Sequence, residues 1–250
     1  MGDCLICTAL WAILQLYVLL DLNMASSVKA IIFDFDGTLY DFTLIPIRLI
    51  LREPYHMFRI RADRVIRKQL RGMDFGTTKE FEAEYNKRMS KLTHLAGEEN
   101  FKWYQTYVEK TMTKVLEKSY KIRDGLKDFI MKLKKKGISM GVLSDYSFVE
   151  KRMLAVGMDQ ELMSLFTKIY SAQEFGCLKP AKRAFLEIAS ALSVAPEECL
   201  VIGDRDDTDG EGARNCGMKF IQITDKKPKK GVQAVRWEQF TQWAEKEFEL

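Results

Sequence analysis

Carboxylates, a hydroxyl and an ammonium group follow separate apolar runs of this 250-residue chain. In chain order they are Asp34 and Asp36, Ser144, Lys179, and Asp204 with Asp209. Two carboxylates about 4 Å apart repel each other by roughly 4 kcal/mol at an effective dielectric constant near 20, and a bound divalent cation relieves that repulsion. A hard site with oxygen ligands alone favours Mg²⁺. These residue types therefore predict a Mg²⁺ site, provided that the fold brings the segments together.

The apolar runs that precede these residues are short and β-branched, which is typical of strands buried on both faces of a parallel sheet. The runs are Val28–Phe33, Ile138–Leu143, Leu200–Gly203 and Phe220–Ile223, with a weaker one at Lys168–Tyr170. Helical periodicity is found at Gly125–Lys136, Val149–Val156, Lys182–Leu192 and Trp237–Leu250. The alternation predicts an α/β fold with a doubly wound, Rossmann-like parallel sheet. Ligands of such sheets bind at the carboxyl ends of the strands, where the polar residues stand.

One long stretch interrupts the alternation. Residues 43–119 are rich in Arg, Lys, Glu, Met and aromatic residues, show helical periodicity and contain no strand-like run. We expect a helical cap inserted between the first two strands, placed over the site as a lid. The expected division is a core of residues 28–42 and 120–250, a cap of residues 43–119 and an apolar N-terminal extension of residues 1–27.

The extension contains an apolar run at residues 4–22, close to the ~20 residues that span a bilayer. Asp3 precedes the run, and no Lys or Arg occurs before Lys29, which does not fit a secretory signal. Three interpretations stay open: a membrane anchor, an extra helix packed on the domain, or an upstream extension of a chain that naturally starts at Met24. Membrane contact is expected only if the run is a real anchor, and otherwise we expect a cytoplasmic protein.

The overall composition excludes several classes of protein. With 47% hydrophobic and 30% charged residues, 5 Pro and 15 Gly, the chain is neither disordered nor collagen-like. A net charge of +4, from 39 basic and 35 acidic residues, is too balanced for a dedicated nucleic-acid binder. The five scattered cysteines indicate reduced intracellular thiols. None of these features predicts an oligomeric state.

Two acidic runs carry a resemblance to a known family. The runs DFDGTLYD at residues 34–41 and GDRDDTDGEGA at residues 203–213 resemble the first and last motifs of the haloacid dehalogenase superfamily, in its phosphatase-type members with a helical cap. The resemblance covers about residues 28–225. It implies that Asp34 is the nucleophile that forms an aspartyl-phosphate. It also implies that Asp36 protonates the leaving oxygen and then activates water.

The same resemblance implies the binding groups of the site. Ser144 and Lys179 stand where the family has its two weaker motifs, and both would bind the transferring phosphoryl group. The implied Mg²⁺ ligands are Asp34, Asp36 through its backbone carbonyl, Asp204, and Asp209, which supports either the metal or Lys179.

The implied function is a Mg²⁺-dependent phosphatase acting on a small phosphorylated metabolite. Dehalogenase members lack the second Asp of the first motif, so the presence of Asp36 argues against C–halogen cleavage. Two alternatives stay open: a phosphomutase of the same family, which returns the phosphoryl group to the product, and a non-catalytic binding protein that keeps the fold. The sequence does not indicate which metabolite is the substrate.

Three arginines are candidate substrate contacts. Arg205 stands where many relatives carry Ser or Thr, and it could reach a substrate anion or pair with Asp206 or Asp207. Arg48 and Arg52 lie one helical turn apart in the basic part of the insert. The alternative for that basic stretch is a solvated helix face.

Overall fold

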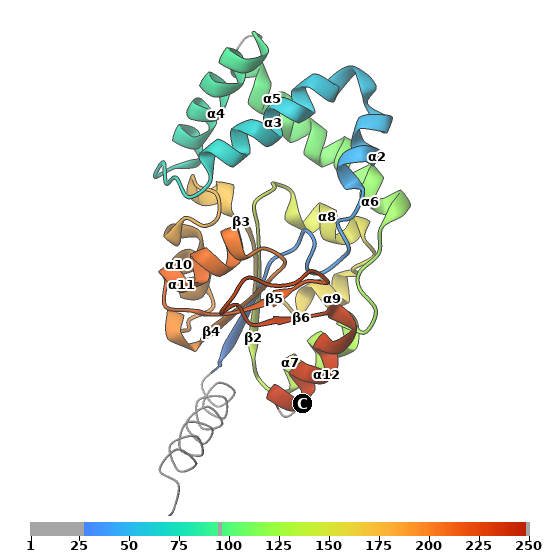
Figure 1. Cartoon of the computed structure of the whole chain (residues 1–250), viewed down its shortest axis with the longest axis vertical. Coiled ribbons are helices and arrows are strands. Elements are labelled where there is room, and N and C mark those ends of the chain that lie inside the picture. Colours follow the sequence, from blue (N-terminus) through green and yellow to red (C-terminus); the bar gives the residue numbers. More distant parts are fainter. Residues whose placement is uncertain (1–27, 95–96, 249–250) are drawn as a thin grey trace, which may run out of the picture.

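The computed structural model, which describes residues 28–94 and 97–248, has a parallel sheet at its centre (Figure 1). The described strands form one six-stranded sheet in the order β3-β2-β1-β4-β5-β6. They are β1 (Ala30–Phe33), β2 (Ser139–Ser144), β3 (Lys168–Ser171), β4 (Cys199–Gly203), β5 (Lys219–Ile223) and β6 (Ala234–Val235). The predicted α/β fold is confirmed. The two-residue edge strand β6 was not predicted, because so short a segment carries no periodic signal.

Helices cover both faces of the sheet, and alternate residues of β1 point to opposite faces. Ile31 and Phe33 pack into one apolar cluster with α7 (Leu126–Lys135), α8 (Val149–Ala155), α9 (Gln160–Ser164) and α12 (Trp237–Glu247). Ala30 and Ile32 pack on the other side against α10 (Lys182–Ala191) and α11 (Glu211–Asn215), where Phe185 is fully buried. Short helical turns complete the core at Ala172–Phe175, Pro196–Glu198 and Asp206–Gly210.

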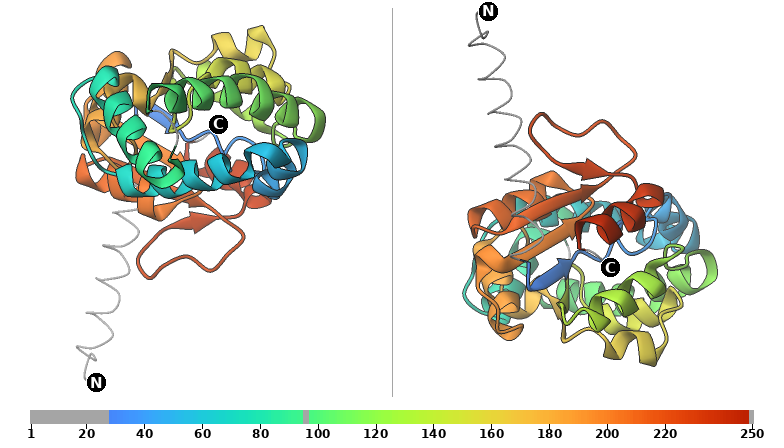
Figure 2. Two further views of the ribbon diagram at one scale, coloured as in Figure 1. Left: turned by 90° about the horizontal axis from the view of Figure 1, so that it is seen from above. Right: turned by 90° about the horizontal axis from the view of Figure 1, so that it is seen from below.

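All described elements between β1 and the core helix α7 are helical. They are α2 (Ile45–Arg52), η1 (Pro54–His56), α3 (Met57–Leu70), α4 (Thr78–Thr93), α5 (Gly97–Thr106), η2 (Tyr107–Met112) and α6 (Thr113–Ser119). We refer to them together as the insert helices. They lie over the carboxyl ends of the strands (Figures 1 and 2). Their interior is a group of buried aromatic rings, Phe81, Tyr85, Phe101 and Tyr104, with ring centres 5.4–6.4 Å apart.

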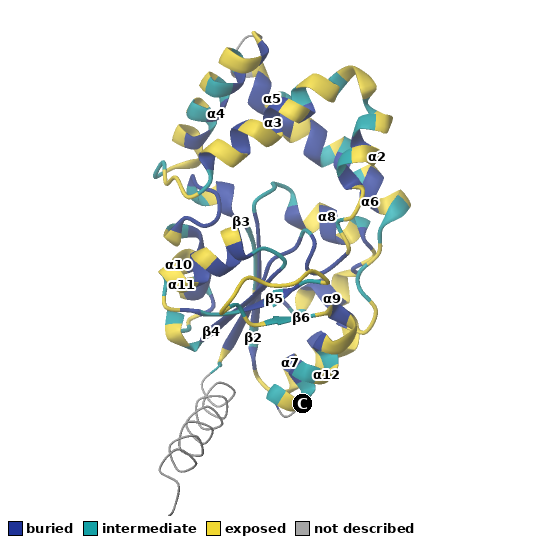
Figure 3. Ribbon diagram, viewed as in Figure 1, coloured by how far each residue is buried: buried dark blue, intermediate teal, exposed yellow. Residues whose placement is uncertain are grey.

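The burial pattern follows these layers: β1 and β4 at the centre of the sheet are buried, β3 and β6 at its edges are mostly of intermediate burial, and the exposed residues lie on outer helix faces and in loops (Figure 3). No helix in residues 28–94 or 97–248 is long and apolar enough to cross a bilayer. The apolar run at residues 4–22, with the three interpretations attached to it, lies outside the described residues.

Candidate active site

The register of the three central strands brings distant segments to one edge of the sheet. Phe33, the last residue of β1, lies opposite Val142 of β2 and Ile202 of β4. Asp34 follows Phe33 directly, and Asp204 comes two residues after Ile202. Neighbouring strands are about 4.8 Å apart, so these carboxylates meet although 170 residues separate them in the chain.

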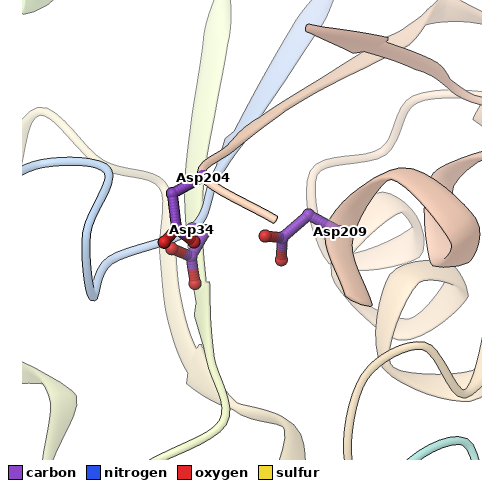
Figure 4. A group of neighbouring side chains, drawn as sticks. All are labelled: Asp34, Asp204 and Asp209. Atoms are coloured by element: carbon purple, nitrogen blue, oxygen red, sulfur yellow. The ribbon is translucent and has the colours of Figure 1, made fainter. Parts of the chain in front are cut away.

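Three carboxylates gather at this edge (Figure 4). Each of Asp34, Asp204 and Asp209 offers one oxygen, and these oxygens lie within 4.8 Å of one another. Burial, reinforced by the neighbouring carboxylates, raises the pKa of Asp34 to about 7 and that of Asp204 to about 8. Such a group carries a large electrostatic cost when all its members are ionised. A divalent cation relieves that cost, and an oxygen-only donor set fits Mg²⁺.

Two glycines allow this close approach. Gly37 has φ +97°, and a Cβ atom on it would lie 2.6 Å from Oδ2 of Asp204. A Cβ atom on Gly203 would lie 2.5 Å from Cγ of Asp209. Any side chain at either position would push a carboxylate out of the cluster.

Lys179 is the buried cation of the site, with 3% of its surface exposed. Its Nζ donates to Oδ1 of Asp34 at 2.6 Å, to Oδ1 of Asp209 at 2.6 Å and to the carbonyl of Leu143 at 3.1 Å. Burial alone would lower the pKa of Lys179, but the two carboxylates hold it above its usual range. Thr38 donates from Oγ1 to Oδ2 of Asp34 at 2.8 Å, so both oxygens of Asp34 are oriented.

Asp36 lies beside this group on the cavity wall, where its carboxylate is held by side chains of the core. Arg152 Nη1 donates to both carboxylate oxygens, at 2.6 and 2.7 Å. The hydroxyl of Tyr40 donates to Oδ1 at 2.6 Å, and that of Ser144 donates to Oδ2 at 2.8 Å. Asp36 is therefore a fully engaged carboxylate, and its side chain is not part of the three-carboxylate cluster.

Ser144 was expected to bind the phosphoryl group, but in the structure it contacts Asp36. Its hydroxyl proton is directed at Asp36, and its oxygen accepts from Nη2 of Arg152 at 2.7 Å. Ser144 is completely buried and is not among the described residues that line the cavity. The physical reason is Arg152, whose guanidinium occupies the space behind both side chains and binds them together.

Arg152 was missed in the sequence analysis. It is completely buried on α8, where Val149 and Met153 form the apolar face. A basic residue three positions after a buried valine lies on the buried side of the helix, and a buried charge needs a partner. That spacing was the available signal, although it did not identify Asp36 as the partner.

Of the three candidate arginines, only Arg205 is among the described residues that line the cavity. Arg205 lines the cavity and pairs with Asp207, with Nε and Nη2 at 3.0 and 2.5 Å from its two oxygens. Arg48 is exposed on α2 and donates to the hydroxyl of Ser119 at 3.2 Å. Arg52 is also exposed on α2, and neither of these two is among the described cavity-lining residues. Ile45 and Leu49 of α2 line the cavity, and the two arginines lie on the exposed side of the same helix.

The cavity lies between the carboxylate cluster and the insert helices and has a volume of about 240 Å³. The insert contributes three basic groups to the cavity, namely Arg64 and Arg67 of α3 and Arg71 directly after it. Nη1 of Arg71 also reaches Oδ2 of Asp207 at 3.1 Å, which ties α3 to the core beside the site.

Known proteins resemble the chain in sequence and in fold. A family model described as haloacid dehalogenase-like hydrolase matches residues 28–217. A glyceraldehyde 3-phosphate phosphatase of Methanopyrus kandleri is 30% identical over 96 residues, which are 38% of this chain and 40% of that protein. The match therefore spans less than half the length of that relative.

Two further matches cover most of the chain. The Bacillus subtilis protein YhcW, which has a provisional phosphatase name, is 28% identical over 211 residues, or 80% of this chain and 84% of that protein. The magnesium-bound structure of YfnB from Bacillus subtilis superimposes with a TM-score of 0.58 at 18% identity, covering 89% of this chain and 99% of YfnB.

Proposed function

The chain belongs to the haloacid dehalogenase-like hydrolase family, and on this premise we propose that it is a Mg²⁺-dependent phosphatase that hydrolyses a small phosphate monoester through an aspartyl-phosphate. One observation carries the proposal. Asp34 is buried and oriented through both oxygens by Lys179 and Thr38, and it faces a cavity next to two further carboxylates. Folding alone gives no reason to concentrate three carboxylates around one ammonium group.

In the first step, an oxygen of Asp34 attacks phosphorus and the bond from phosphorus to the ester oxygen breaks. The leaving oxygen needs a proton, and Asp36 on the cavity wall is the proposed donor. Ser144 and Arg152 orient the carboxylate of Asp36, so the structure favours a positioning role for Ser144. The products of this step are the free alcohol and phosphorylated Asp34.

In the second step, Asp36 removes a proton from water as the water oxygen attacks phosphorus. The bond between phosphorus and Asp34 breaks, inorganic phosphate leaves, and Asp34 is regenerated. Lys179 remains within hydrogen-bonding distance of Asp34 and compensates negative charge on the phosphoryl oxygens.

Mg²⁺ would be held by Asp34, Asp204 and the backbone carbonyl of Asp36, with Asp209 nearby. Once bound, the cation neutralises charge that develops on the transferring group. Asp209 has both oxygens engaged, Oδ1 by Lys179 at 2.6 Å and Oδ2 by the backbone N–H of Arg205 at 3.2 Å. We therefore assign Asp209 to the support of Lys179.

The insert helices act in this proposal as a cap over the catalytic core. They supply one wall of the cavity, and the core edge supplies the other. Phosphoryl transfer to Asp34 requires that bulk water be limited during the first step. A cap of residues 43–119 on a core of residues 28–42 and 120–250 would provide that limit.

The decisive test is turnover of a chromogenic phosphate ester by the full chain, with and without Mg²⁺. We expect phosphate release that requires Mg²⁺ and that is lost in Asp34→Asn. Asp128→Asn is the matched control, because Asp128 is exposed on α7. Wild-type activity in Asp34→Asn would refute the nucleophile. No Mg²⁺-dependent release from any ester would favour a binding protein.

A second measurement separates the phosphatase from the phosphomutase. Beryllium fluoride should occupy Asp34 in either enzyme, because both pass through the same aspartyl-phosphate. A phosphatase releases inorganic phosphate stoichiometrically with substrate loss, whereas a mutase yields an isomeric phosphate ester with little phosphate. We expect the stoichiometric release.

A further inference from the structure

Arg67 of α3 is a buried arginine with one donor group unused. Only 6% of its surface is exposed, and within residues 28–94 and 97–248 no hydrogen-bond partner reaches its buried Nη1. Its Nη2 donates to the backbone carbonyl of Asp145 at 2.5 Å. Its guanidinium also lies over the rings of Tyr146 and Tyr104, with ring centres 4.3 and 5.3 Å away. A buried charged donor without an acceptor is costly and calls for an explanation.

The position of Arg67 supplies that explanation, because Arg67 lines the cavity described above. Arg64, one turn before Arg67 on the same face of α3, lines the same cavity. Arg71, the residue directly after α3, lines it as well. Asp63 is the carboxylate nearby on α3. Burial raises its pKa, and its Oδ1 accepts from the hydroxyl of Tyr85 at 2.8 Å. Asp63 lines the cavity too, and three arginines against this one carboxylate leave the wall with a net positive charge.

The rest of the cavity limits the size and polarity of what binds. The phosphoryl group of a substrate would lie at Asp34 and Lys179, so the rest of that molecule extends toward α3. Apolar side chains also line the cavity, among them Ile45, Leu49 and Ile60. A volume of about 240 Å³ lies below the range of about 300–1,000 Å³ found for drug-sized ligands, which favours a small substrate.

We infer that the substrate is a small phosphate monoester with a second anionic group at the end of a short carbon chain, an inference that rests on the proposed function. Arg67 binds this second group through Nη1. A carboxylate or a second phosphate both have the required chemistry, since each accepts hydrogen bonds and carries negative charge. Arg64 adds positive charge on the same wall.

The test uses matched pairs of substrates with the full chain in Mg²⁺. Phosphoglycolate and its longer carboxyalkyl homologues are compared with hydroxyalkyl phosphates, in which a CH₂OH group replaces the carboxylate. In a second arm, alkanediol bisphosphates are compared with the same hydroxyalkyl phosphates. We expect wild type to prefer the dianionic member, and the arm with the larger preference identifies the second group.

Variants assign the preference to Arg67. The measured quantity is kcat/KM for the preferred ester divided by kcat/KM for its hydroxyl partner. We expect Arg67→Met to lower this ratio by roughly 10- to 100-fold, because the loss of a charged hydrogen bond has an effect of this size. Arg61→Met is the matched control on α3, because Arg61 is exposed and is not among the described cavity-lining residues; it should leave the ratio unchanged. If Arg67→Met does not fold, Arg67→Lys gives the same measurement with the charge retained, and a lowered ratio is again expected.

The outcomes distinguish a failure of the role of Arg67 from a failure of the proposed phosphatase activity. A ratio that is unchanged in the Arg67 variants would mean that Arg67 only ties α3 to the core, and the inference would be wrong. Equal hydrolysis of both members of every pair by wild type would also overturn it, while leaving the phosphatase intact. Absence of Mg²⁺-dependent hydrolysis of all these esters would overturn the proposed function itself.

Discussion

The pair formed by Arg152 and Asp36 permits a quantitative prediction. Arg152 is completely buried and the side chain of Asp36 is 10% exposed, so the two charges meet away from water. Arg152→Met removes the cation and leaves the carboxylate without it. Loss of one member of a buried ion pair costs about 3–5 kcal/mol. The carbonyls of Tyr146 and Ser147 also lose donors at 2.8 and 3.0 Å, which adds about 1 kcal/mol.

We therefore expect Arg152→Met to lower the free energy of unfolding by at least about 3 kcal/mol in urea titrations followed by circular dichroism. Arg214→Met is the control, because Arg214 also pairs with a carboxylate, that of Asp206 at 2.7 Å, but its side chain is 50% exposed. Exposed pairs contribute about 0–1 kcal/mol, so this variant should stay close to wild type.

A double-mutant cycle isolates the interaction between the two charges. Asp36→Asn removes the anion, and in the double variant neither charge is left alone. The double variant should be more stable than the sum of the single effects predicts, by about 1–3 kcal/mol. A loss below about 1 kcal/mol for Arg152→Met, or additive single effects, would refute the claim that Arg152 and Asp36 form a stabilising buried pair. If Arg152→Met cannot be purified folded, Arg152→Lys enters the cycle with the same expected sign.

Three more predictions concern the carboxylate cluster. Gly37→Ala places a Cβ atom against Asp204 and should weaken Mg²⁺ binding at least tenfold in calorimetric titrations. Gly157→Ala is the control, because Gly157 also has a positive φ, +90°, but a Cβ atom on it would meet no atom within 4 Å. This control should leave Mg²⁺ binding unchanged. In EDTA, the free energy of unfolding should fall by a few kcal/mol from pH 4 to pH 8. The reason is that Asp34 and Asp204 have raised pKa values of about 7 and 8 in the folded protein, so they bind more protons there than in the unfolded chain. A flat profile in EDTA, or a pH dependence that persists in Mg²⁺, would contradict this prediction. Lys179→Met should lower kcat at least 10²-fold and stability by about 3–5 kcal/mol, and a kcat above a tenth of wild type would contradict the assigned role.

The core of the fold was predictable because its signal is local. A buried parallel strand is a short apolar run whatever its neighbours are, and the runs that became β1, β2, β4 and β5 are of this kind. The position of Asp34 directly after β1 and of Asp204 directly after β4 then places both at one edge of the sheet. Their convergence also needs β1 and β4 to be neighbours in the sheet, and the structure pairs these two strands and brings the carboxylates together.

The partners of buried charges were not predictable in this way. The spacing from Val149 places Arg152 on the buried side of α8, but nothing local identifies Asp36, 116 residues away, as its partner. Ser144 was expected at the phosphoryl group, and only the position of α8 directs its hydroxyl to Asp36.

The insert shows the same division between local and tertiary information. The periodicity of residues 43–119 predicts helices, and the described elements in this range are helical. Which of its arginines face the cavity depends on how each helix is rotated against the core, and that rotation is set by packing between surfaces distant in sequence. The sequence by itself thus determined the elements and the acidic strand ends, because hydrophobic period and chain order are local properties. The tertiary structure alone decided that Arg67, and not Arg48 or Arg52, lines the cavity.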